Sequence, residues 1–553
     1  MPADATLGTP RHVRRAGCVG RSAVYATHAM VATSQPLAAQ AALDVLRRGG
    51  NAVDAAIAAN AVLGVVEPMS CGVGGDLLAI VWEARTEKLF GLNASGRSPR
   101  RATVEAMRSR GLSELPEAGP LSWSVPAAVD GWEALRSRFG SRPFSELLQP
   151  AIALAEEGFP VSDVIAGMWQ ASAPNLLAFA DSARTYLPGG RAPRAGGIFR
   201  NPDLAATYRE LAREGRDAFY RGRIAHDLVA FSEAHGGLLS PDDLAETSAT
   251  WVEPIGTDYR GVRIWELPPP AQGVTTLQML NLLGVYDLRA LGPLSAEYWH
   301  LFVEAKKIAY ADRARFIADP EKARLPVDEL MSKVYARERR KLIDPARARS
   351  GIAAGDPVRG DTVYLSVVDS QRNCVSFIQS IYQHFGSCMV PGRLGFALQN
   401  RGSQFSLDPS HPNRLEPRKR PFHTIIPALA TRGGKPWFVF GVMGADMQPQ
   451  GQVQVLVNLL DFGMDVQAAG EAPRIEHLGS PTPTGRGEAE GGGLVVVERG
   501  IPDEVFAGLV RRGHQAVWTE LNGGGYQGIL IDPDTGALQG GSEPRKDGCA
   551  AGY

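Results

Sequence analysis

The sequence has few cysteines and no long apolar run, and each shortage argues against a class of protein. Its five cysteines are scattered over 553 residues without CxxC spacing, so neither a zinc site nor a disulfide framework is expected. No run of about 18 apolar residues occurs, which argues against a membrane-spanning helix. The N-terminal segment lacks the apolar core of a secretory signal, and an odd cysteine count suits a reducing compartment. We therefore expect a cytoplasmic protein.

The sequence also has no excess of charge of one sign. It carries 58 basic and 59 acidic residues, a net charge of −1, so the basic surface typical of nucleic-acid binding is not expected. Apolar residues make up 44% and charged residues 21% of the chain, as in ordinary soluble globular proteins. The length is sufficient for a large buried core.

The N-terminal part alternates helical and strand patterns after a loose tail at residues 1–20. Residues 36–48 and 52–66 have helical periodicity, and the second segment is rich in alanine. A glycine loop at residues 72–75 then leads into an apolar strand at 77–82. Phosphate-binding loops run from strand to glycine loop to helix. Because the order here is helix, loop, strand, we interpret the loop as a tight turn.

Further helices are expected at residues 144–157, 202–214 and 295–317, and strand alternation returns at 256–267. Residues 348–361 are rich in glycine and lack apolar periodicity, which indicates an exposed, flexible linker.

A threonine directly after this linker is the most informative feature of the chain. Thr362 begins an apolar strand that ends near Asp369, and a second strand-like run follows at residues 374–381. N-terminal-nucleophile hydrolases place Thr, Ser or Cys at the start of such a strand and expose it by self-cleavage. The hydroxyl then attacks the substrate while the freed α-amine takes its proton. The pattern predicts a self-processing amide hydrolase.

A second feature that points to this chemistry is a glycine-containing turn. Residues 438–441 read as a strand, Gly444 and Ala445 follow, and a helix opens near Pro449. A turn between strand and helix can present free backbone N–H groups, which an oxyanion hole requires.

Several motifs together resemble the γ-glutamyltranspeptidase family of N-terminal-nucleophile hydrolases, over nearly the whole chain. They are Gly49–Ala56 (GGNAVDAA), Glu67-Pro68 with Gly72–Gly75, the Thr362 strand, Arg420-Pro421, and the C-terminal Asp547–Tyr553 (DGCAAGY). The resemblance implies an α+β fold, the four-layer αββα sandwich. It also implies cleavage between Asp361 and Thr362 into a large subunit, residues 21–361 with the tail, and a small subunit, 362–553. The two would remain together as a heterodimer, which could dimerise further, without a metal or organic cofactor.

The resemblance assigns catalytic roles to four positions. Thr362 matches the family nucleophile, and Ser380 falls where the family has a threonine that binds the nucleophile's amine or hydroxyl. Gly444 and Ala445 fall on the paired glycines whose N–H groups hold the oxyanion. Ala445 replaces a glycine, and a positive φ at that position would be strained.

The substrate pocket departs from the family pattern. Ser95 stands where the family has the arginine that binds the glutamyl α-carboxylate. The residues that match the family's other substrate contacts are Gln404 for the aspartate, His423 and Thr424 for the serine pair, and Tyr382 for the asparagine. Arg401, His423, Thr424 and Arg97 could instead recognise a carboxylate without an α-amine. This pattern resembles the amidohydrolase-like branch that includes oxamate amidohydrolase-type enzymes.

The expected function is therefore hydrolysis of a small carboxylate-bearing amide, or transfer of its acyl group, through a Thr362 acyl-enzyme. Two alternatives stay open. One is a true γ-glutamyltransferase or glutathione hydrolase, and the other is an unprocessed, non-enzymatic relative.

Overall fold

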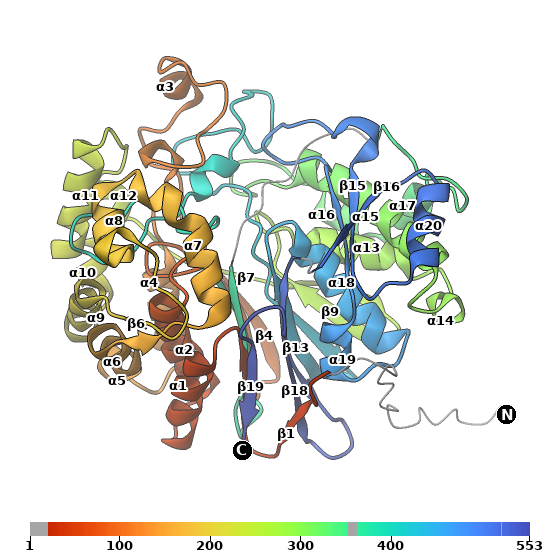
Figure 1. The fold of residues 1–553 in the computed structure, drawn as a ribbon, viewed down its shortest axis with the longest axis horizontal. Coiled ribbons are helices and arrows are strands. Elements are labelled where there is room, and N and C mark those ends of the chain that lie inside the picture. Colours follow the sequence, from red (N-terminus) through yellow and green to blue (C-terminus); the bar gives the residue numbers. More distant parts are fainter. Residues whose placement is uncertain (1–19, 352–361, 521–522) are drawn as a thin grey trace.

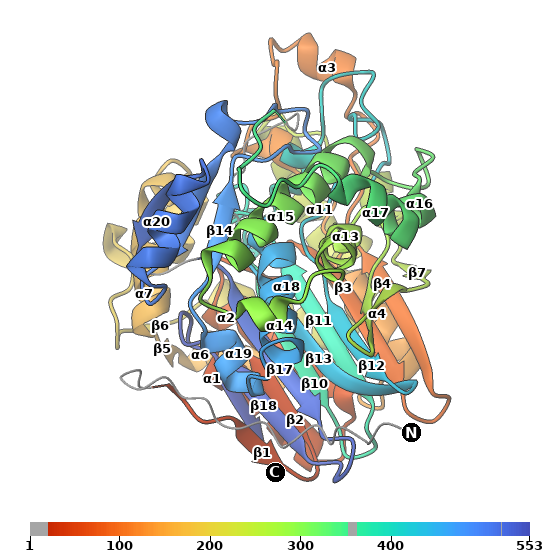
Figure 2. The same ribbon diagram turned by 90° about the vertical axis from the view of Figure 1, so that its right-hand side faces the viewer.

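Two seven-stranded sheets packed face to face form the centre of the molecule (Figure 1). The computed structural model describes residues 20–351, 362–520 and 523–553. Helices cover the outer face of each sheet, which gives the four layers expected from the resemblance (Figure 2). Asp361, most of the 348–361 linker and nearly all of the N-terminal tail lie outside the described residues.

The strands of the first sheet run in the order β1-β18-β17-β13-β12-β9-β8, and those of the second in the order β19-β2-β10-β11-β3-β4-β7. The first sheet comprises β1 (Val24–Ala26), β18 (Leu538–Ser542), β17 (Gly525–Ile531), β13 (Lys435–Met443), β12 (Ala428–Arg432), β9 (Val262–Glu266) and β8 (Ile255–Tyr259). The second comprises β19 (Cys549–Gly552), β2 (Met30–Thr33), β10 (Val363–Val368), β11 (Cys374–Ser380), β3 (Asp76–Glu83), β4 (Lys88–Ala94) and β7 (Thr250–Val252).

The helices fall into two groups, on the left and right of Figure 1. The group beside the second sheet comprises α1 (Pro36–Arg47), α2 (Ala52–Val66), α4 (Ala128–Phe139), α5 (Phe144–Leu147), α6 (Gln149–Glu157), α7 (Asp163–Leu177), α8 (Ala180–Tyr186), α9 (Pro202–Glu214), α10 (Arg216–Tyr220), α11 (Arg223–Ala234) and α12 (Pro241–Ala245). The group beside the first sheet comprises α13 (Gly273–Leu283), α14 (Leu288–Leu291), α15 (Ala296–Phe316), α16 (Val327–Met331), α17 (Lys333–Arg340), α18 (Met447–Leu460), α19 (Val466–Glu471) and α20 (Asp503–Arg511).

The other α-helix and strands are helix α3 (Val104–Arg108), a three-stranded sheet of β14 (Ile475–Leu478), β15 (Leu494–Glu498) and β16 (Gln515–Thr519), and a pair of β5 (Phe159–Pro160) with β6 (Ile198–Phe199).

The alternation of side chains along β10 shows how the layers are held together. Val363, Leu365 and Val367 pack in the core shared with α1 and α2. Tyr364 and Val368 point the other way, into the core between the two sheets. A strand buried on both faces reads as a continuous apolar run, which is what the sequence has here. Thr362 shares the face of Tyr364 by this alternation, so the strand directs it between the sheets.

Most expected elements are found, and two are divided. Helices α1, α2, α9 and α15 and the β10–β11 hairpin agree with the sequence within one or two residues. The expected helix 144–157 breaks at Leu148, because Pro150 opens a new helix, α6. The strand expected at 256–267 is a hairpin of β8 and β9, which turns at Arg260 and Gly261 with positive φ angles of 49° and 81°.

Both large sheets interleave strands from before and after Thr362. In the second sheet β10 pairs with β2 on one side and β11 on the other, and β11 pairs with β3. In the first sheet β12 pairs with β9, and β18 pairs with β1. A break in the chain before Thr362 would therefore leave both sheets hydrogen-bonded.

No helix within the described residues is both long enough and apolar enough to span a membrane.

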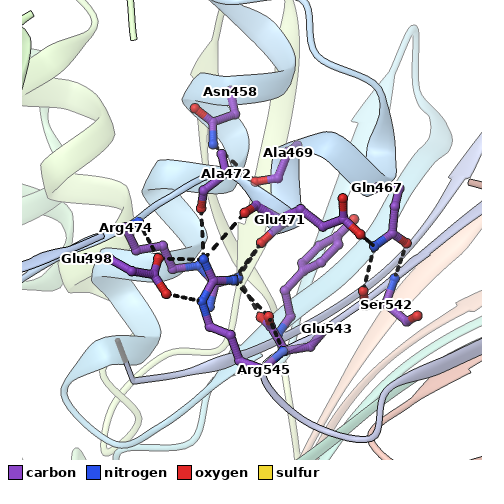
Figure 3. A network of polar contacts seen from close by, with 12 residues as sticks. Asn458, Gln467, Ala469, Glu471, Ala472, Arg474, Glu498, Ser542, Glu543 and Arg545 are labelled. Atoms are coloured by element: carbon purple, nitrogen blue, oxygen red, sulfur yellow. Dashed lines mark hydrogen bonds and ion pairs between the residues drawn. The ribbon is translucent and has the colours of Figure 1, made fainter. Parts of the chain in front are cut away.

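A buried ionic network ties the C-terminal part of the chain together (Figure 3). Arg545 contacts Glu498 through Nε and Nη2 at 2.6 Å each, and its Nη1 lies 2.8 Å from Glu543 Oε1. Arg474 Nη2 donates to Glu543 Oε2 at 2.6 Å. Burial opposes ionisation of Glu543, but the two guanidinium groups hold the pKa of this carboxyl below its ordinary value. The network joins the residue before β14 and the last residue of β15 to the segment after β18.

Replacing Arg545 with Met should lower the free energy of unfolding by about 3–5 kcal/mol, because Glu498 and Glu543 would keep their buried charges without this partner. Urea denaturation of purified protein measures the change. Arg85→Gln is the matched control, since the Arg85 side chain is 82% exposed and its ion pair with Glu83 should contribute little. Equal stability of the two variants would contradict a structural role for the network.

Candidate active site

The register of three neighbouring strands places Thr362, Ser380 and Asp76 in a row. Val363 pairs with Gln379, so Thr362 lies opposite Ser380, and Ser380 pairs with Asp76 at the start of β3. Thr362 Oγ1 lies 3.2 Å from Ser380 Oγ, and both residues are buried. The row joins three polar side chains at the ends of strands whose interiors are mainly apolar.

Arg401 is a buried cation beside this row. Its Nη2 donates to Ser380 Oγ at 3.3 Å and its Nη1 to Thr424 Oγ1 at 2.8 Å, while its guanidinium stacks over the Tyr382 ring at 4.2 Å. Within the described residues no carboxylate lies within salt-bridge distance of it, and its Nε has no hydrogen-bond partner. Burial lowers the pKa of Arg401 to about 10, so the guanidinium remains charged near neutral pH.

The turn with Gly444 and Ala445 is fixed by Gln272, which opens α13. Gln272 Nε2 donates to the carbonyls of both Thr424 and Ala445, at 2.7 and 2.9 Å. Its Oε1 accepts from Arg313 Nη1 at 2.7 Å. This connects the turn, through Thr424 and Arg401, to Ser380 and Thr362.

Ala445 has the positive φ angle that the sequence analysis described as strained for a residue with a Cβ. Gly444 has φ 115° and Ala445 has φ 46°, in the left-handed region that costs a non-glycine residue about 1 kcal/mol or more. Within the described part of the chain neither N–H donates to a protein acceptor. Both donors are therefore available to a bound oxyanion.

His423 contacts the row at Asp76. Its Nε2 donates to Asp76 Oδ2 at 2.9 Å, and its Nδ1 accepts from the Ile425 N–H at 3.4 Å. Asp76 Oδ1 also accepts from the Gly96 N–H at 2.7 Å. Burial, with the nearby Arg401 charge, lowers the pKa of His423 to about 4, so the ring is neutral near pH 7.

A polar pocket opens beside Tyr382 and Asp446, the residues that follow Ser380 and Ala445 closely in the chain. Its lining comprises Leu115, Glu117, Arg313, Tyr382, Ser403, Gln404, Phe422, Asp446, Thr482, Thr484 and Arg486. Two of the residues expected to bind substrate, Tyr382 and Gln404, are in this lining. Arg401, His423 and Thr424 are not in the lining. Tyr382 covers Arg401, His423 contacts Asp76, and Thr424 contacts Arg401.

Arg97 lies outside this group. Its Nη2 donates to both carboxylate oxygens of Glu321 at 2.9 Å, and its Nη1 donates to the Arg418 carbonyl. It lines a different depression with Ser95 and Asp243. The structure therefore gives Arg97 structural partners and does not bring it to the pocket beside Tyr382.

One cluster has the residue types of a metal site, His300, Glu304 and His514, all buried. His300 Nδ1 lies 2.8 Å from His514 Nε2, and Lys307 Nζ already donates to Glu304 Oε1 at 2.9 Å. A lysine ammonium at this carboxylate opposes binding of a cation, and the cluster instead holds the segment at Asp344 through His300 Nε2.

Sequence reasoning missed Asp76, Gln272, Arg313 and Arg486. Asp76 carried a usable signal, since it is an acidic residue at the start of an otherwise apolar strand. The others meet the site only through contacts between residues far apart in the chain, which no local pattern encodes.

Comparisons with known proteins identify the family. The family model described as Gamma-glutamyltranspeptidase matches residues 38–553. The chain belongs to the gamma-glutamyltranspeptidase family. It is 37% identical to the glutathione hydrolase-like YwrD proenzyme of Bacillus subtilis (strain 168), over 96% of this chain and 99% of that protein. Identity to the oxamate amidohydrolase proenzyme of Klebsiella pneumoniae is 35%, over 95% and 99% of the two chains.

Among solved structures of the same family, the crystal structure of cephalosporin acylase from Bacillus halodurans matches with a TM-score of 0.89 and 42% identity. The match covers 98% of this chain and 99% of that one. The αββα fold of N-terminal-nucleophile hydrolases is thereby confirmed, together with the amidohydrolase-like character of the relatives. The family members act on amide bonds, and the relatives named as proenzymes are made as precursors.

The neutral His423 should make the protein less stable in acid. Its pKa is about 6.5 when unfolded and about 4 in the fold, so its contribution to stability is present above pH 6.5 and is lost as the pH falls toward 4. The loss from this residue is about 3 kcal/mol. His423→Gln should weaken the fall in unfolding free energy between pH 7 and 4.5, measured in urea. His235→Gln, at an exposed histidine, is the control; an unchanged slope in His423→Gln would contradict this assignment.

Proposed function

We propose that the protein is a self-processing amidohydrolase whose nucleophile is Thr362 and whose substrate is a small amide bearing a carboxylate. The observation that carries the proposal is the row of Thr362, Ser380 and Asp76 and its link, through Arg401, Thr424 and Gln272, to the turn with the open N–H groups of Gly444 and Ala445. It supplies a hydroxyl, a hydroxyl partner and oxyanion donors in one connected site.

In the precursor, Thr362 Oγ attacks the Asp361 carbonyl carbon, and the peptide C–N bond breaks as an ester forms. Water then hydrolyses that ester, which leaves a carboxylate on Asp361 and a free α-amine on Thr362. An α-amine has a pKa of about 7.7–8.0, so an appreciable fraction can act as a base near neutral pH.

In the mature enzyme, Thr362 Oγ attacks the substrate amide and its proton passes to the α-amine, which returns a proton to the leaving nitrogen. The Gly444 and Ala445 N–H groups stabilise the oxyanion, and one such donor is worth about 3–4 kcal/mol. Water, or another acceptor, then releases the acyl group. The residues named need no metal or organic cofactor for these steps.

The pocket lining favours an anionic substrate that lacks an α-amine. Gln404 stands where an aspartate would bind an ammonium group, and it contacts the pocket beside Tyr382. Arg486 is the accessible cation: its side chain is 35% exposed and pairs with Glu114, which is 61% exposed. A pair so exposed to solvent is weak and can exchange Glu114 for a substrate carboxylate.

The interleaved sheets support a heterodimer of residues 1–361 and 362–553 that stays associated after cleavage, since β10 and β11 remain paired with β2 and β3. A further dimer of these heterodimers and a location in the cytoplasm remain proposals from the sequence.

Glutathione hydrolysis is the second candidate, favoured by the name of the Bacillus subtilis relative. The replacement of the family arginine and aspartate by Ser95 and Gln404 counts against it. Release of nitroanilide from a γ-glutamyl anilide at ordinary rates would favour this candidate. An unprocessed scaffold protein is the third, and Thr362 would then have no role.

Thr362→Ala should remain one uncleaved chain without amidase activity, because it lacks the hydroxyl that is proposed to attack the Asp361 carbonyl. A denaturing gel with intact-mass analysis of wild type and variant measures this. Wild type should give two fragments that meet between Asp361 and Thr362. Thr362→Ser retains a hydroxyl and should still be cleaved; a processed, active Thr362→Ala would refute the mechanism.

Arg486→Gln should raise KM for carboxylate-bearing amides about tenfold, the effect of losing one charge-assisted hydrogen bond, with little change for neutral amides. Steady-state assays on matched pairs of acid and neutral amides test this. Arg85→Gln, remote from the pocket, should change neither. An equal rise in KM for both substrate types would show that Arg486 does not recognise the carboxylate.

A further inference from the structure

Arg313, near the end of α15, is a buried arginine that lines the pocket beside Tyr382. Its Nη1 donates to Gln272 Oε1 at 2.7 Å and to Asp446 Oδ1 at 2.6 Å. Its Nη2 donates to Asp446 Oδ2 and to the Pro481 carbonyl, at 3.1 Å each. Each Nη atom of a guanidinium carries two hydrogens, so all of these hydrogens have acceptors within the protein. Arg313 could bind a substrate carboxylate through them only by giving up one of these contacts.

The acceptors of Arg313 lie on both sides of the Ala445 peptide. A guanidinium can only donate, so the Gln272 amide turns its oxygen toward Arg313 and its NH2 group away from it. That NH2 group donates to the Ala445 carbonyl at 2.9 Å. The next residue, Asp446, is held by Arg313 directly through both carboxylate oxygens. Arg313 thereby holds the backbone of the turn at two successive residues.

These contacts surround the residue of the turn that is strained. Ala445 has φ 46°, a conformation that a Cβ disfavours by about fivefold or more. The Asp446 carbonyl also accepts from the Tyr310 hydroxyl, which lies one helical turn before Arg313 on α15. The contacts to the Ala445 carbonyl and to Asp446 are made in the left-handed conformation of Ala445. Residues of α13 and α15 thus stabilise a backbone conformation that the sequence of the turn disfavours.

We propose that Arg313 is a positioning residue, which keeps the turn in the conformation that directs the Gly444 and Ala445 N–H groups at the oxyanion. The inference rests on the proposed function, in which those N–H groups stabilise the charge that develops during attack. Arg313 and Gln272 precede Thr362 in the chain, whereas the turn follows it. The oxyanion site would therefore be complete only while the two fragments remain together.

Ala445→Gly separates positioning of the turn from general support of the fold. Glycine adopts the left-handed conformation without a Cβ penalty, so the turn should then depend less on Arg313. The test variant is Arg313→Lys, which keeps a cation beside Asp446 but lacks the planar fork. Arg260→Lys is the matched control. Arg260 also donates to a buried aspartate, Asp461, and to two carbonyls, but it lies at the turn between β8 and β9.

Arg313→Lys should lower kcat about tenfold with little change in KM, because the oxyanion donors are misplaced while the pocket is kept. The probe is glutaryl nitroanilide, a γ-glutamyl anilide without its α-amine. Measured against Ala445→Gly alone, the same lysine substitution should lower kcat by no more than about twofold. Arg260→Lys should lower the free energy of unfolding in urea and leave kcat unchanged.

Crystal structures of the variants measure the turn directly, whether or not the nitroanilide is cleaved. In Arg313→Lys, Ala445 should change to a negative φ. In Arg313→Lys combined with Ala445→Gly, the turn should keep its positive φ at position 445. This readout does not move if Arg313 contributes only to overall stability.

An unchanged φ at Ala445 in the Arg313→Lys crystal would overturn the inference. An equal loss of kcat with and without Ala445→Gly would also overturn it. A raised KM with unchanged kcat would make Arg313 a substrate contact instead. Failure of the proposed function looks different: wild type then gives no fragment beginning at Thr362 and no turnover, while the crystal structures still report the turn.

Discussion

The register between β10, β11 and β3 is the constraint on which the rest of the site depends. A shift by one residue would turn Thr362, Ser380 and Asp76 to the opposite faces of their strands. The register is held because Val363, Leu365 and Val367 must face α1 and α2 while Tyr364 faces the other sheet. Packing of the two apolar cores thus fixes the positions of the three polar side chains before any substrate binds.

A second feature of the site is the set of hydrogen bonds around Arg401, a buried cation with no carboxylate within salt-bridge distance in the described chain. Arg401, Tyr382 and Thr424 form a connected tier of buried side chains next to the pocket. Gln272 joins this tier to the Ala445 turn by two donated hydrogen bonds, to the carbonyls of Thr424 and Ala445. Every contact in this tier is between segments far apart in the sequence. The tier therefore couples β11, the segment before β12, and the loop after β13 into one rigid unit.

Much of the fold was predictable from sequence because its signals are local. The alanine-rich α2 begins at Asn51 with a capping box to Asp54, and the β10–β11 hairpin follows the apolar runs on both sides of its polar turn. Pro150 was a local signal for a helix break, but the helical periodicity of residues 144–157 led to the prediction of one continuous helix. The surroundings of two expected substrate contacts were not predictable. The resemblance put His423 at a substrate position and the charge of Arg401 suggested a carboxylate contact, but in the fold His423 contacts Asp76 and Arg401 stacks on Tyr382.

That difference bears on how such a family changes substrate. By the resemblance, Ser95 and Gln404 stand where the family has the arginine and the aspartate that hold a zwitterion. We propose that the row with Thr362 and the turn with Gly444 and Ala445 act without either of those charges. The Arg401 guanidinium stacks on the Tyr382 ring, donates to Ser380 Oγ and does not line the pocket. We propose that recognition shifts to other residues of the pocket lining such as Arg486, which comes from a separate segment. In the described chain the Arg486 side chain donates to Glu114, which is not part of the row, so this position can vary in sequence while Thr362 is kept.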